Sequence, residues 1–340
     1  MRVAVLRAPG EVVLEERPVP RPGPGEVLVR VRSVGVCCSD THYYEHGRIG
    51  RFVVEQPLVL GHEPSGEVVE LGPGVPAPAV GQRVSVEPGV PDLVCEQCLA
   101  GRYNLCPRMR FFATPPVDGA FAEYVVVHAA FAHPVPDSIS DDAAALLEPL
   151  SVGVWACRKG RVTAGSRVLI TGAGPIGLVS VQTALAFGAT EVVVSDVNPA
   201  RLALARELGA TEVVDARERS TAELADAAGP PGVLIEASGH PPAIADGIRA
   251  LDRAGRAVLV GMGGDEVPLP LGVVQERELE VTGTFRYAGT WPTAIALVAA
   301  GRVDLDRLVT GSHGLDGAEA ALTAARLDPA AVKDVVHPDR

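Results

Sequence analysis

Three residues in the first third of the chain have side chains that could together bind a metal ion. Cys37 is followed about twenty-five residues later by the adjacent pair His62 and Glu63. Cysteine, histidine and glutamate are all zinc ligands, and a catalytic zinc keeps three protein ligands and one open position. Taken singly, the three could equally be a buried thiol, a turn histidine and a solvated carboxylate. Taken together, they make a catalytic zinc site a candidate.

A glycine-rich turn in the second half of the chain could bind a dinucleotide. It follows an apolar, β-rich run at Arg167–Thr171 and precedes a run of helical period at residues 176–187. In G-x-G-x-x-G, the first glycine permits a tight turn, the second lets the backbone approach a pyrophosphate, and the third lets helix and strand pack closely. The N-terminus of the helix also offers N–H groups to the phosphates. The residues predicted to bind the cofactor here are Gly172, Gly174, Pro175, Ile176 and Gly177.

An acidic residue follows the next predicted strand, at residues 191–195. Asp196 lies 24 positions after Gly172, close to the spacing of about 20 for the acid that binds a ribose 2′-hydroxyl. A carboxylate there would repel a 2′-phosphate, which favours NAD over NADP. The alternative is that Asp196 only begins the turn before Asn198, the expected N-cap of a helix at residues 199–208. Arg201 in that helix is assigned to the same cofactor site.

The elements around these residues predict two domains. The first third is rich in Pro, Gly and Val, and alternating runs such as 27–31 and 67–71 indicate strands joined by turns. Helical patterns follow at 143–147 and 152–158. From Arg167 strands and helices alternate, with later strands near 232–235 and 257–260 and a helix near 293–300. This alternation indicates an α/β fold whose parallel sheet is covered on both faces.

Composition excludes several classes of partner. The 340 residues carry a net charge of −12 and have no basic run, which argues against nucleic acid or an anionic membrane as the main partner. The chain has no apolar run of membrane-spanning length and no secretory signal, so a cytoplasmic location is expected. The 6 cysteines are clustered rather than spread along the chain, which favours metal binding or catalysis over a disulfide framework.

The segment beginning at Gly61-His62-Glu63 resembles the signature of zinc-containing medium-chain alcohol dehydrogenases, G-H-E-x2-G-x5-G-x2-V, at every fixed position. The resemblance covers essentially the whole chain and is closest to the sorbitol (polyol) dehydrogenase branch. Five long runs carry this resemblance: CCSDTHYYEHGRIG at 37–50, GRYNLCP at 101–107, FFATPP at 111–116, EPLSVGVWACRKG at 148–160 and FRYAGTWP at 285–292.

This resemblance implies a catalytic zinc held by Cys37, His62 and Glu63. In the polyol branch, the residue at the position of Glu148 holds a zinc-bound water, and direct ligation by Glu148 is the alternative. Ser39 lies where the family has a proton-relay hydroxyl. The resemblance also assigns four residues to the pocket for a polyol, with a surface arginine and a packed tyrosine as the alternative for the last two: Tyr43, Phe112, Arg286 and Tyr287.

The chain departs from the family pattern at two places. Position 38, often glycine, is Cys38, which has no expected role beyond added sensitivity to oxidation. In the structural-zinc lobe the pattern C-x2-C-x2-C-x7-C has lost its first cysteine to a carboxylate. Aspartate can bind zinc, so one carboxylate and three thiolates could hold a second zinc, and the alternative is a metal-free lobe. The residues at these four positions are Asp92, Cys95, Cys98 and Cys106.

The resemblance implies a β-rich GroES-like catalytic domain at 1–150, a Rossmann domain with a doubly wound parallel sheet at 151–285, and a return to the catalytic domain at 286–340. Zinc would polarise a substrate hydroxyl while hydride passes to NAD, in a cleft to which both domains contribute. A homo-oligomer, either tetramer or dimer, is expected. The alternatives are a sibling enzyme acting on threonine, glucose or a sugar-alcohol phosphate, a zinc-free reductase, and a non-catalytic dinucleotide-binding scaffold.

Overall fold

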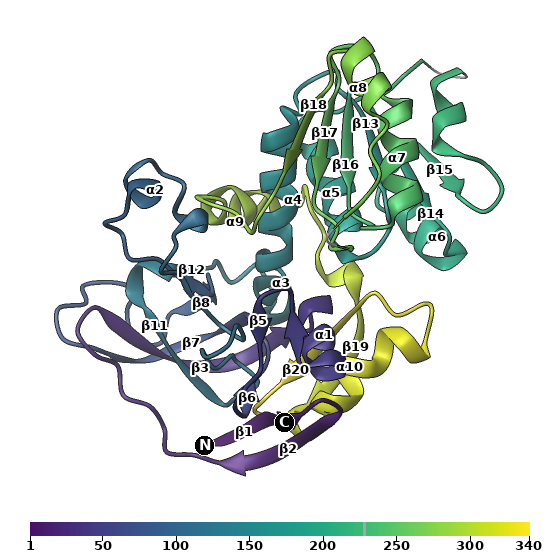
Figure 1. Ribbon diagram of the computed structural model, residues 1–340. Coiled ribbons are helices and arrows are strands. Elements are labelled where there is room, and N and C mark those ends of the chain that lie inside the picture. Colours follow the sequence, from purple (N-terminus) through teal and green to yellow (C-terminus); the bar gives the residue numbers. More distant parts are fainter. Residues whose placement is uncertain (227–228, 265) are drawn as a thin grey trace. The chain divides into compact units, whose positions relative to one another are not determined.

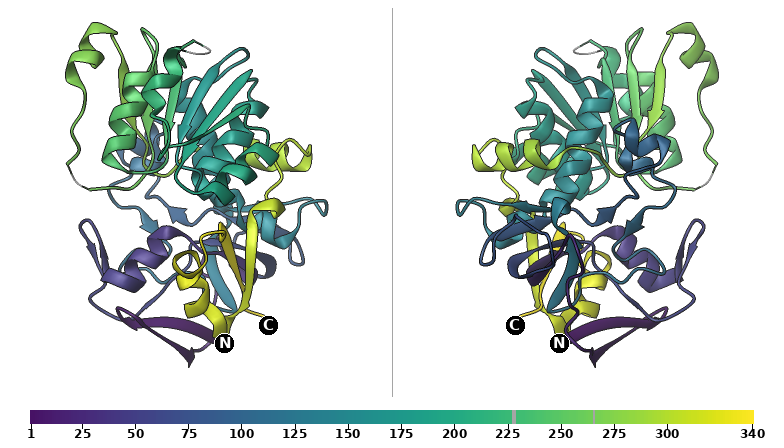
Figure 2. Two further views of the ribbon diagram at one scale, coloured as in Figure 1. Left: turned by 90° about the vertical axis from the view of Figure 1, so that its right-hand side faces the viewer. Right: turned by 90° about the vertical axis from the view of Figure 1, so that its left-hand side faces the viewer.

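A computed structural model of the protein describes residues 1–226, 229–264 and 266–340 (Figure 1). These residues form two compact units, one made of Met1–Glu148 with Leu305–Arg340 and the other of Pro149–Asp304. The two ends of the chain lie near each other in the first unit (Figure 2), where the Arg2 guanidinium donates to the carbonyl of Pro338 at 2.8 Å.

The first unit is built mainly from antiparallel strands. Its largest sheet has the order β12-β8-β7-β3-β20-β19, and β11 also pairs with β3. The strands of this sheet are β3 (Glu26–Gly35), β7 (Glu63–Leu71), β8 (Arg83–Val86), β11 (Tyr124–His128), β12 (Ala132–Pro134), β19 (Val309–Gly314) and β20 (Lys333–His337). The smaller sheets contain β1 (Arg2–Ala8), β2 (Glu11–Glu16), β6 (Leu58–Val59), β4 (Arg48–Ile49), β5 (Phe52–Val53), β9 (Gly89–Val90) and β10 (Arg110–Phe111).

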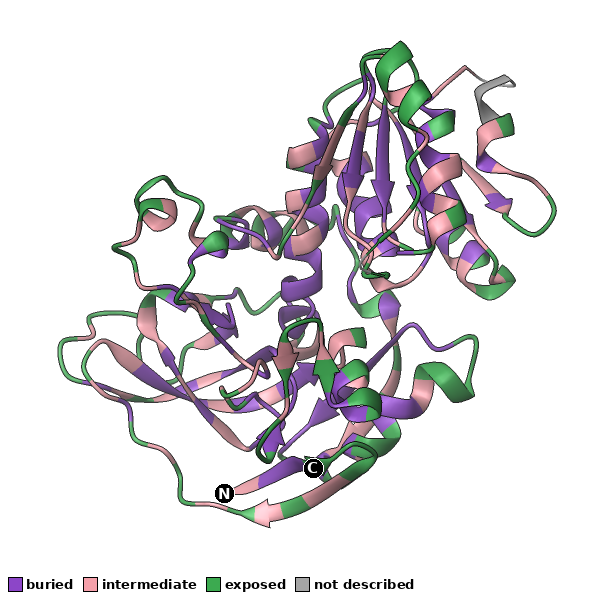
Figure 3. Cartoon of the chain, viewed as in Figure 1, coloured by how far each residue is buried: buried purple, intermediate pink, exposed green. Residues whose placement is uncertain are grey.

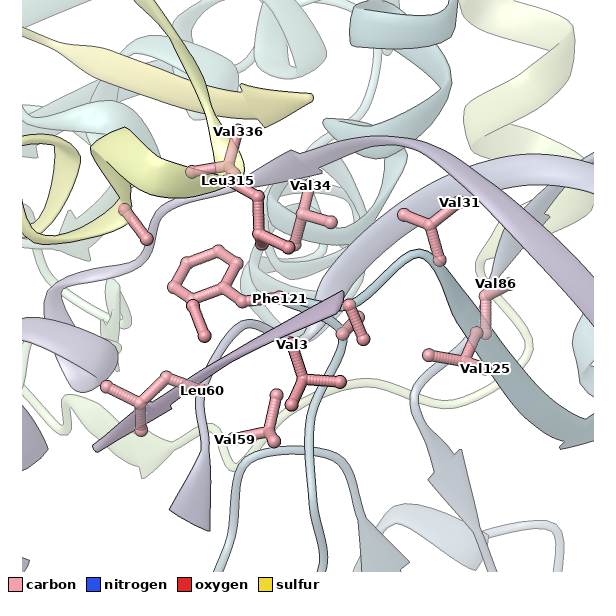
Figure 4. Close-up of a cluster of buried hydrophobic side chains, with 14 of the residues drawn as sticks. Val3, Val31, Val34, Val59, Leu60, Val86, Phe121, Val125, Leu315 and Val336 are labelled. Carbon is pink, nitrogen blue, oxygen red and sulfur yellow. The ribbon is translucent and has the colours of Figure 1, made fainter. Parts of the chain in front are cut away.

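Helices of the first unit fill the connections between these strands. They are α1 (Cys38–His46), α2 (Glu96–Leu99), α3 (Asp141–Ala145) and α10 (Ala318–Leu327), with the 3-10 turns η1 (Tyr103–Leu105), η2 (Ala129–Phe131), η4 (Asp306–Leu308) and η5 (Leu315–Gly317). The core of the unit gathers apolar residues from segments far apart in the sequence. Phe121, 1% exposed, lies among Val3, Val34, Leu315 and Val336 (Figure 4).

The second unit contains a parallel sheet with the order β15-β14-β13-β16-β17-β18. Its strands are β13 (Arg167–Thr171), β14 (Glu191–Asp196), β15 (Glu212–Asp215), β16 (Val233–Glu236), β17 (Arg256–Leu259) and β18 (Glu280–Gly283). The central strands are almost wholly buried (Figure 3), as expected of a parallel sheet with helices on both faces. From β13 the chain adds β14 and β15 on one side of the sheet, and it then crosses to the other side of β13 to add β16, β17 and β18. This reversal of direction is typical of a Rossmann fold.

The helices of the second unit are α4 (Leu147–Gly160), which begins at the junction of the units, α5 (Pro175–Ala186), α6 (Pro199–Glu207), α7 (Pro241–Ala250), α8 (Leu271–Glu276) and α9 (Trp291–Ala299), with the 3-10 turn η3 (Thr221–Asp226). The predicted strand–helix alternation is confirmed, and Asn198 caps α6 by accepting the amides of Ala200 and Arg201. Strand β15 was not singled out from the sequence, where its four residues are only partly apolar.

The structure differs from the expected division at residues 286–304. These residues belong to the second unit, and the chain rejoins the first unit at Leu305. The reason is that α9 and the turn before it bind to α4: Arg158 donates to the carbonyl of Gly289 at 2.9 Å and to the hydroxyl of Thr293 at 2.7 Å. Among the described residues, no helix combines the length and apolar character needed to cross a bilayer.

Candidate metal and cofactor sites

Sheet pairing brings the three predicted ligands of the catalytic metal together. Cys37 follows the end of β3, and Glu63 is the first residue of the neighbouring antiparallel strand β7, so Gly35 lies directly opposite Glu63. His62 immediately precedes β7. The ligand atoms of Cys37, His62 and Glu63 all lie within 4.8 Å of one another. A thiolate, an imidazole and a carboxylate at this spacing form a donor set suited to zinc.

A buried carboxylate orients the histidine of this set. Asp40, which is fully buried, has Oδ1 3.3 Å from Nδ1 of His62. Its two oxygens also accept the amides of Gly61 and Cys37 at 2.9 and 3.1 Å. Burial alone would lower the pKa of His62, but the charge of Asp40 raises it well above its ordinary value. A carboxylate on one ring nitrogen leaves the other directed toward a metal, as is usual for histidine ligands.

Glu63 is held by a buried lysine. The ammonium of Lys333 on β20 lies 2.6 Å from Oε1 of Glu63, and both side chains are nearly inaccessible, at 3% and 1% exposure. Lys333 also donates to the carbonyl of Val36 at 2.7 Å. Burial would lower the pKa of Lys333, but the neighbouring carboxylate reverses this and raises it. The second oxygen, Oε2, is buried and has no hydrogen-bond partner among the described residues.

That unpartnered oxygen is the observation that tests the fit of a metal. A buried carboxylate oxygen without a donor is costly, and a bound cation satisfies it. Glycine at position 35 makes room for this oxygen, because a Cβ added there would lie only 2.0 Å from Oε2. The residues present therefore fit a zinc ion.

The other residues predicted for the catalytic site are distributed over both units. Ser39 and Tyr43 lie on α1, and Tyr43 is 4% exposed. Glu148 is buried in the first turn of α4 and is not among the three ligands grouped above. Phe112 follows β10 and donates its amide to the carbonyl of Pro88.

Arg286 and Tyr287 belong to the second unit. The guanidinium of Arg286 lies 4.8 Å from the centre of the Phe285 ring, and Tyr287 packs edge-on against the fully buried Trp291. The metal ligands belong to the other unit. The assignment of Arg286 and Tyr287 to the polyol pocket therefore stays a prediction.

The four residues of the predicted structural-zinc lobe converge. The carboxylate of Asp92 and the sulfurs of Cys95, Cys98 and Cys106 all lie within 4.8 Å of one another. Oδ1 of Asp92 accepts the amides of Val94 and Cys95, each at 2.9 Å, and these bonds lower the pKa of Asp92.

Amides of the lobe also face its sulfurs, as in sites that bind a metal through thiolates. The amide of Cys98 donates to the sulfur of Cys95 at 3.4 Å, which lowers the pKa of that thiol. The other oxygen of Asp92 lies 2.5 Å from the guanidinium of Arg108. This arginine balances the charge of the carboxylate at the position where the family pattern has cysteine.

The glycine-rich turn joins β13 to α5 as predicted. The third glycine has no room for a side chain, since a Cβ on Gly177 would lie 1.8 Å from the carbonyl oxygen of Gly172. Gly172 itself has φ +91° and packs against the backbone of Ala237 and Ser238. A Cβ on Gly174 would meet nothing within 4 Å. The first turn of α5 has no side-chain cap, so its N–H groups are available to an anion.

Asp196 links the turn to the next strand. Its Oδ2 accepts the amide of Ala173 at 2.6 Å, and its Oδ1 accepts the amide of Asn198 at 2.8 Å. An ionised carboxylate has about four lone-pair sites, so both bonds leave room for a ribose hydroxyl. Arg201 lies in the first turn of α6, where its amide donates to Asn198 at 3.2 Å.

Three functional side chains were not identified from the sequence. Asp40 has a local signal, because it stands three residues after Cys37 and closes a capping box at the start of α1. Lys333 has none, being separated from Glu63 by 270 residues. Glu236, fully buried at the end of β16, accepts the amides of Ser238 and Gly239 and so fixes the turn that packs against Gly172.

Comparison with protein families matches both halves of the chain. Residues 23–137 match the alcohol dehydrogenase GroES-like domain, and residues 175–300 match the zinc-binding dehydrogenase family. These two regions contain the predicted metal ligands and the glycine-rich turn, apart from its first residues.

Individual members of these families are similar to this chain over most of the length of both proteins. Sorbitol dehydrogenase of Macaca fascicularis is 46% identical over 319 residues, which is 92% of this chain and 89% of the relative. Sorbitol dehydrogenase of Bacillus subtilis is 41% identical over 100% of this chain and 98% of the relative. A solved alcohol dehydrogenase from Escherichia coli CFT073, in complex with NADH, is 28% identical with a TM-score of 0.93, covering 99% of each chain.

Proposed function

We propose that this chain, which belongs to the zinc-binding alcohol dehydrogenase family and is a sorbitol dehydrogenase-like enzyme, acts on polyols. It would oxidise one secondary hydroxyl, which converts the polyol to a ketose, with NAD as the hydride acceptor. The observation that carries this proposal is the convergence of Cys37, His62 and Glu63, whose ligand atoms lie within 4.8 Å of one another, together with the buried, unpartnered oxygen of Glu63. Three protein ligands with an open position are typical of a catalytic zinc rather than a structural one.

Each residue near this site has a proposed task. Zinc bound here supplies Lewis acidity, which makes the proton of a substrate hydroxyl easier to remove. Asp40 fixes the ring of His62, and Lys333 fixes the carboxylate of Glu63, so the donor set is preorganised. Ser39, two residues after Cys37, accepts the hydroxyl proton and passes it toward solvent. Glu148 is proposed to position a water at the site.

The substrate class rests on the relatives and on the predicted pocket. Two relatives that match nearly the whole chain are sorbitol dehydrogenases, which favours a polyol over threonine, glucose or a sugar-alcohol phosphate. We assign Tyr43, Phe112, Arg286 and Tyr287 to polyol binding, and the five donors of Arg286 suit a ligand with several hydroxyls. Assembly into a homotetramer or dimer stays a prediction that sedimentation can test.

The experiment is to follow NADH formation with sorbitol, xylitol, ribitol and galactitol, beside simple secondary alcohols, threonine and glucose. Each reaction is run with the zinc-loaded enzyme, after chelation, and after zinc is restored. We expect turnover on at least one polyol, lost with zinc and regained with it. Turnover that survives complete removal of zinc would contradict the assignment of Cys37, His62 and Glu63 as ligands of a catalytic zinc. Activity confined to a non-polyol alcohol would keep the mechanism and change the substrate class.

Cofactor choice is proposed to depend on Asp196. Replacing Asp196 by alanine removes the charge that would repel a 2′-phosphate, so the ratio of kcat/KM for NADP to that for NAD should rise about tenfold or more, equivalent to about 1.4 kcal/mol. Steady-state kinetics with both cofactors measures this ratio. Asp215→Ala is the matched control, since Asp215 ends the next strand and pairs with Arg217. An unchanged ratio in Asp196→Ala would leave Asp196 only its role in the turn.

The lobe at Asp92, Cys95, Cys98 and Cys106 is proposed to hold a second, structural zinc. Plasma emission of the purified, zinc-loaded protein should find two zinc ions per chain, and Cys106→Ser should retain one. Cys157→Ala is the control, because Cys157 is buried in α4 outside both clusters, and it should retain two. One zinc in the unmodified protein that Cys106→Ser also retains would show that the lobe is metal-free.

A further inference from the structure

The exposed face of α1 carries two histidines that neither proposed zinc site uses. His42 and His46 are separated by one helical turn, and both are exposed to solvent (helix α1 in Figure 1). Their ring centres lie 5.7 Å apart, with the ring planes tilted by 48°. Side chains four residues apart are neighbours on one face of a helix, so the two rings can approach the same ligand.

The separation of the rings suits a shared metal ion. Zinc binds a histidine nitrogen at about 2.0–2.1 Å, and two such bonds at a tetrahedral angle place the ring centres roughly 5 Å apart. The observed 5.7 Å is close to this separation, so rotation of the two exposed side chains can bring both rings onto one ion. Two histidines at this spacing on one helix are also the metal-binding part of the H-E-x-x-H motif, and the ligands here come from the run His42-Tyr43-Tyr44-Glu45-His46.

The neighbouring charges favour a cation. The carboxylate of Glu45 has Oε2 3.8 Å from Nε2 of His46, and its side chain is 30% exposed. Its other oxygen lies 3.9 Å from Nε of Arg326, whose side chain is 65% exposed, so this contact is long and well solvated. Glu45 can therefore turn toward an ion between the histidines, and water can complete the coordination.

We propose that His42 and His46 form a surface site for a divalent transition-metal ion that favours imidazole, such as Ni²⁺ or Cu²⁺. Neither histidine belongs to the donor set of Cys37, His62 and Glu63 or to the cysteine lobe. Cys38 is exposed one turn before His42, and its thiol is the competing second ligand that the test must distinguish.

The test uses the full, untagged chain with its zinc sites loaded, and Ni²⁺ as the probe in equilibrium dialysis. Nickel and zinc are both counted, so that binding at a new site is separated from exchange for resident zinc. We expect one additional nickel per chain without loss of zinc, and we expect His46→Gln to weaken this binding at least about tenfold. His240→Gln is the control, because His240 is an exposed histidine at the N-cap of another helix, α7, and this variant should bind nickel as the unmodified chain does.

Three results would overturn the proposal. One is the absence of additional nickel, and another is nickel that appears only as zinc leaves. The third is binding that His46→Gln preserves and Cys38→Ser abolishes, which would assign the ion to Cys38 and His42 instead. None of these results depends on turnover, so the outcome is independent of the proposed polyol oxidation.

Discussion

Lys333→Met is expected to destabilise the zinc-free protein by about 3–5 kcal/mol, the usual cost of leaving one partner of a buried ion pair uncompensated. The ammonium of Lys333 lies 2.6 Å from Glu63, and the two side chains are 3% and 1% exposed. Methionine fills a similar volume but supplies no charge, and the carbonyl of Val36 also loses its donor. Because zinc places a positive charge beside the same carboxylate, the loss should be smaller in the zinc-loaded protein.

Urea unfolding with and without zinc measures both quantities. The double variant Glu63→Gln/Lys333→Met is the control, since it removes both charges and should recover much of the stability while binding zinc poorly. Lys333→Arg should retain most of the stability, because arginine keeps the positive charge. A loss below about 1 kcal/mol in the zinc-free single variant, within the range of ordinary substitutions, would show that the pair is not the main support of Glu63.

The same residue marks the limit of what the sequence could predict. Cys37, His62 and Glu63 were found because their types and local pattern point to zinc, and the structure brings them together. Lys333 reaches Glu63 only because β20 pairs with the end of β3, where Val335 lies opposite Gly35. No sequence pattern near Lys333 predicts that β20 pairs with β3. The position of Asp40 beside Cys37, in contrast, could have been inferred from the capping box at the start of α1.

The glycine-rich turn that we propose to bind the cofactor was predictable for the opposite reason, because its determinants are local. The strand, the three glycines, the helix and Asp196 lie within thirty residues, and the structure joins them as expected. The sequence predicted a return to the first domain at residue 286, whereas the first unit resumes at Leu305. Residues 286–304 carry no sequence signal for the contacts between Arg158 and the turn before α9. Such contacts depend on packing between distant helices.

Replacing either of two glycines in this turn by alanine is expected to weaken NADH binding, but for different reasons. In Gly174→Ala the new Cβ meets nothing within 4 Å, and the extended backbone at Gly174 suits alanine. The zinc-loaded, cofactor-free protein should therefore unfold at nearly its original temperature. The same Cβ would stand where the backbone must approach the pyrophosphate, so the Kd for NADH should rise about 100-fold, equivalent to about 2.7 kcal/mol.

In Gly177→Ala the fold itself is affected. The new Cβ would lie 1.8 Å from the carbonyl oxygen of Gly172, which is backbone and must move. We expect a loss of about 1–3 kcal/mol in stability without cofactor, as for other overpacked sites, together with weakened NADH binding. Thermal unfolding and fluorescence titration with NADH separate the two variants. If Gly174→Ala bound NADH as tightly as the unmodified chain, the pyrophosphate could not lie against this turn, and the assignment of the cofactor to it would be wrong.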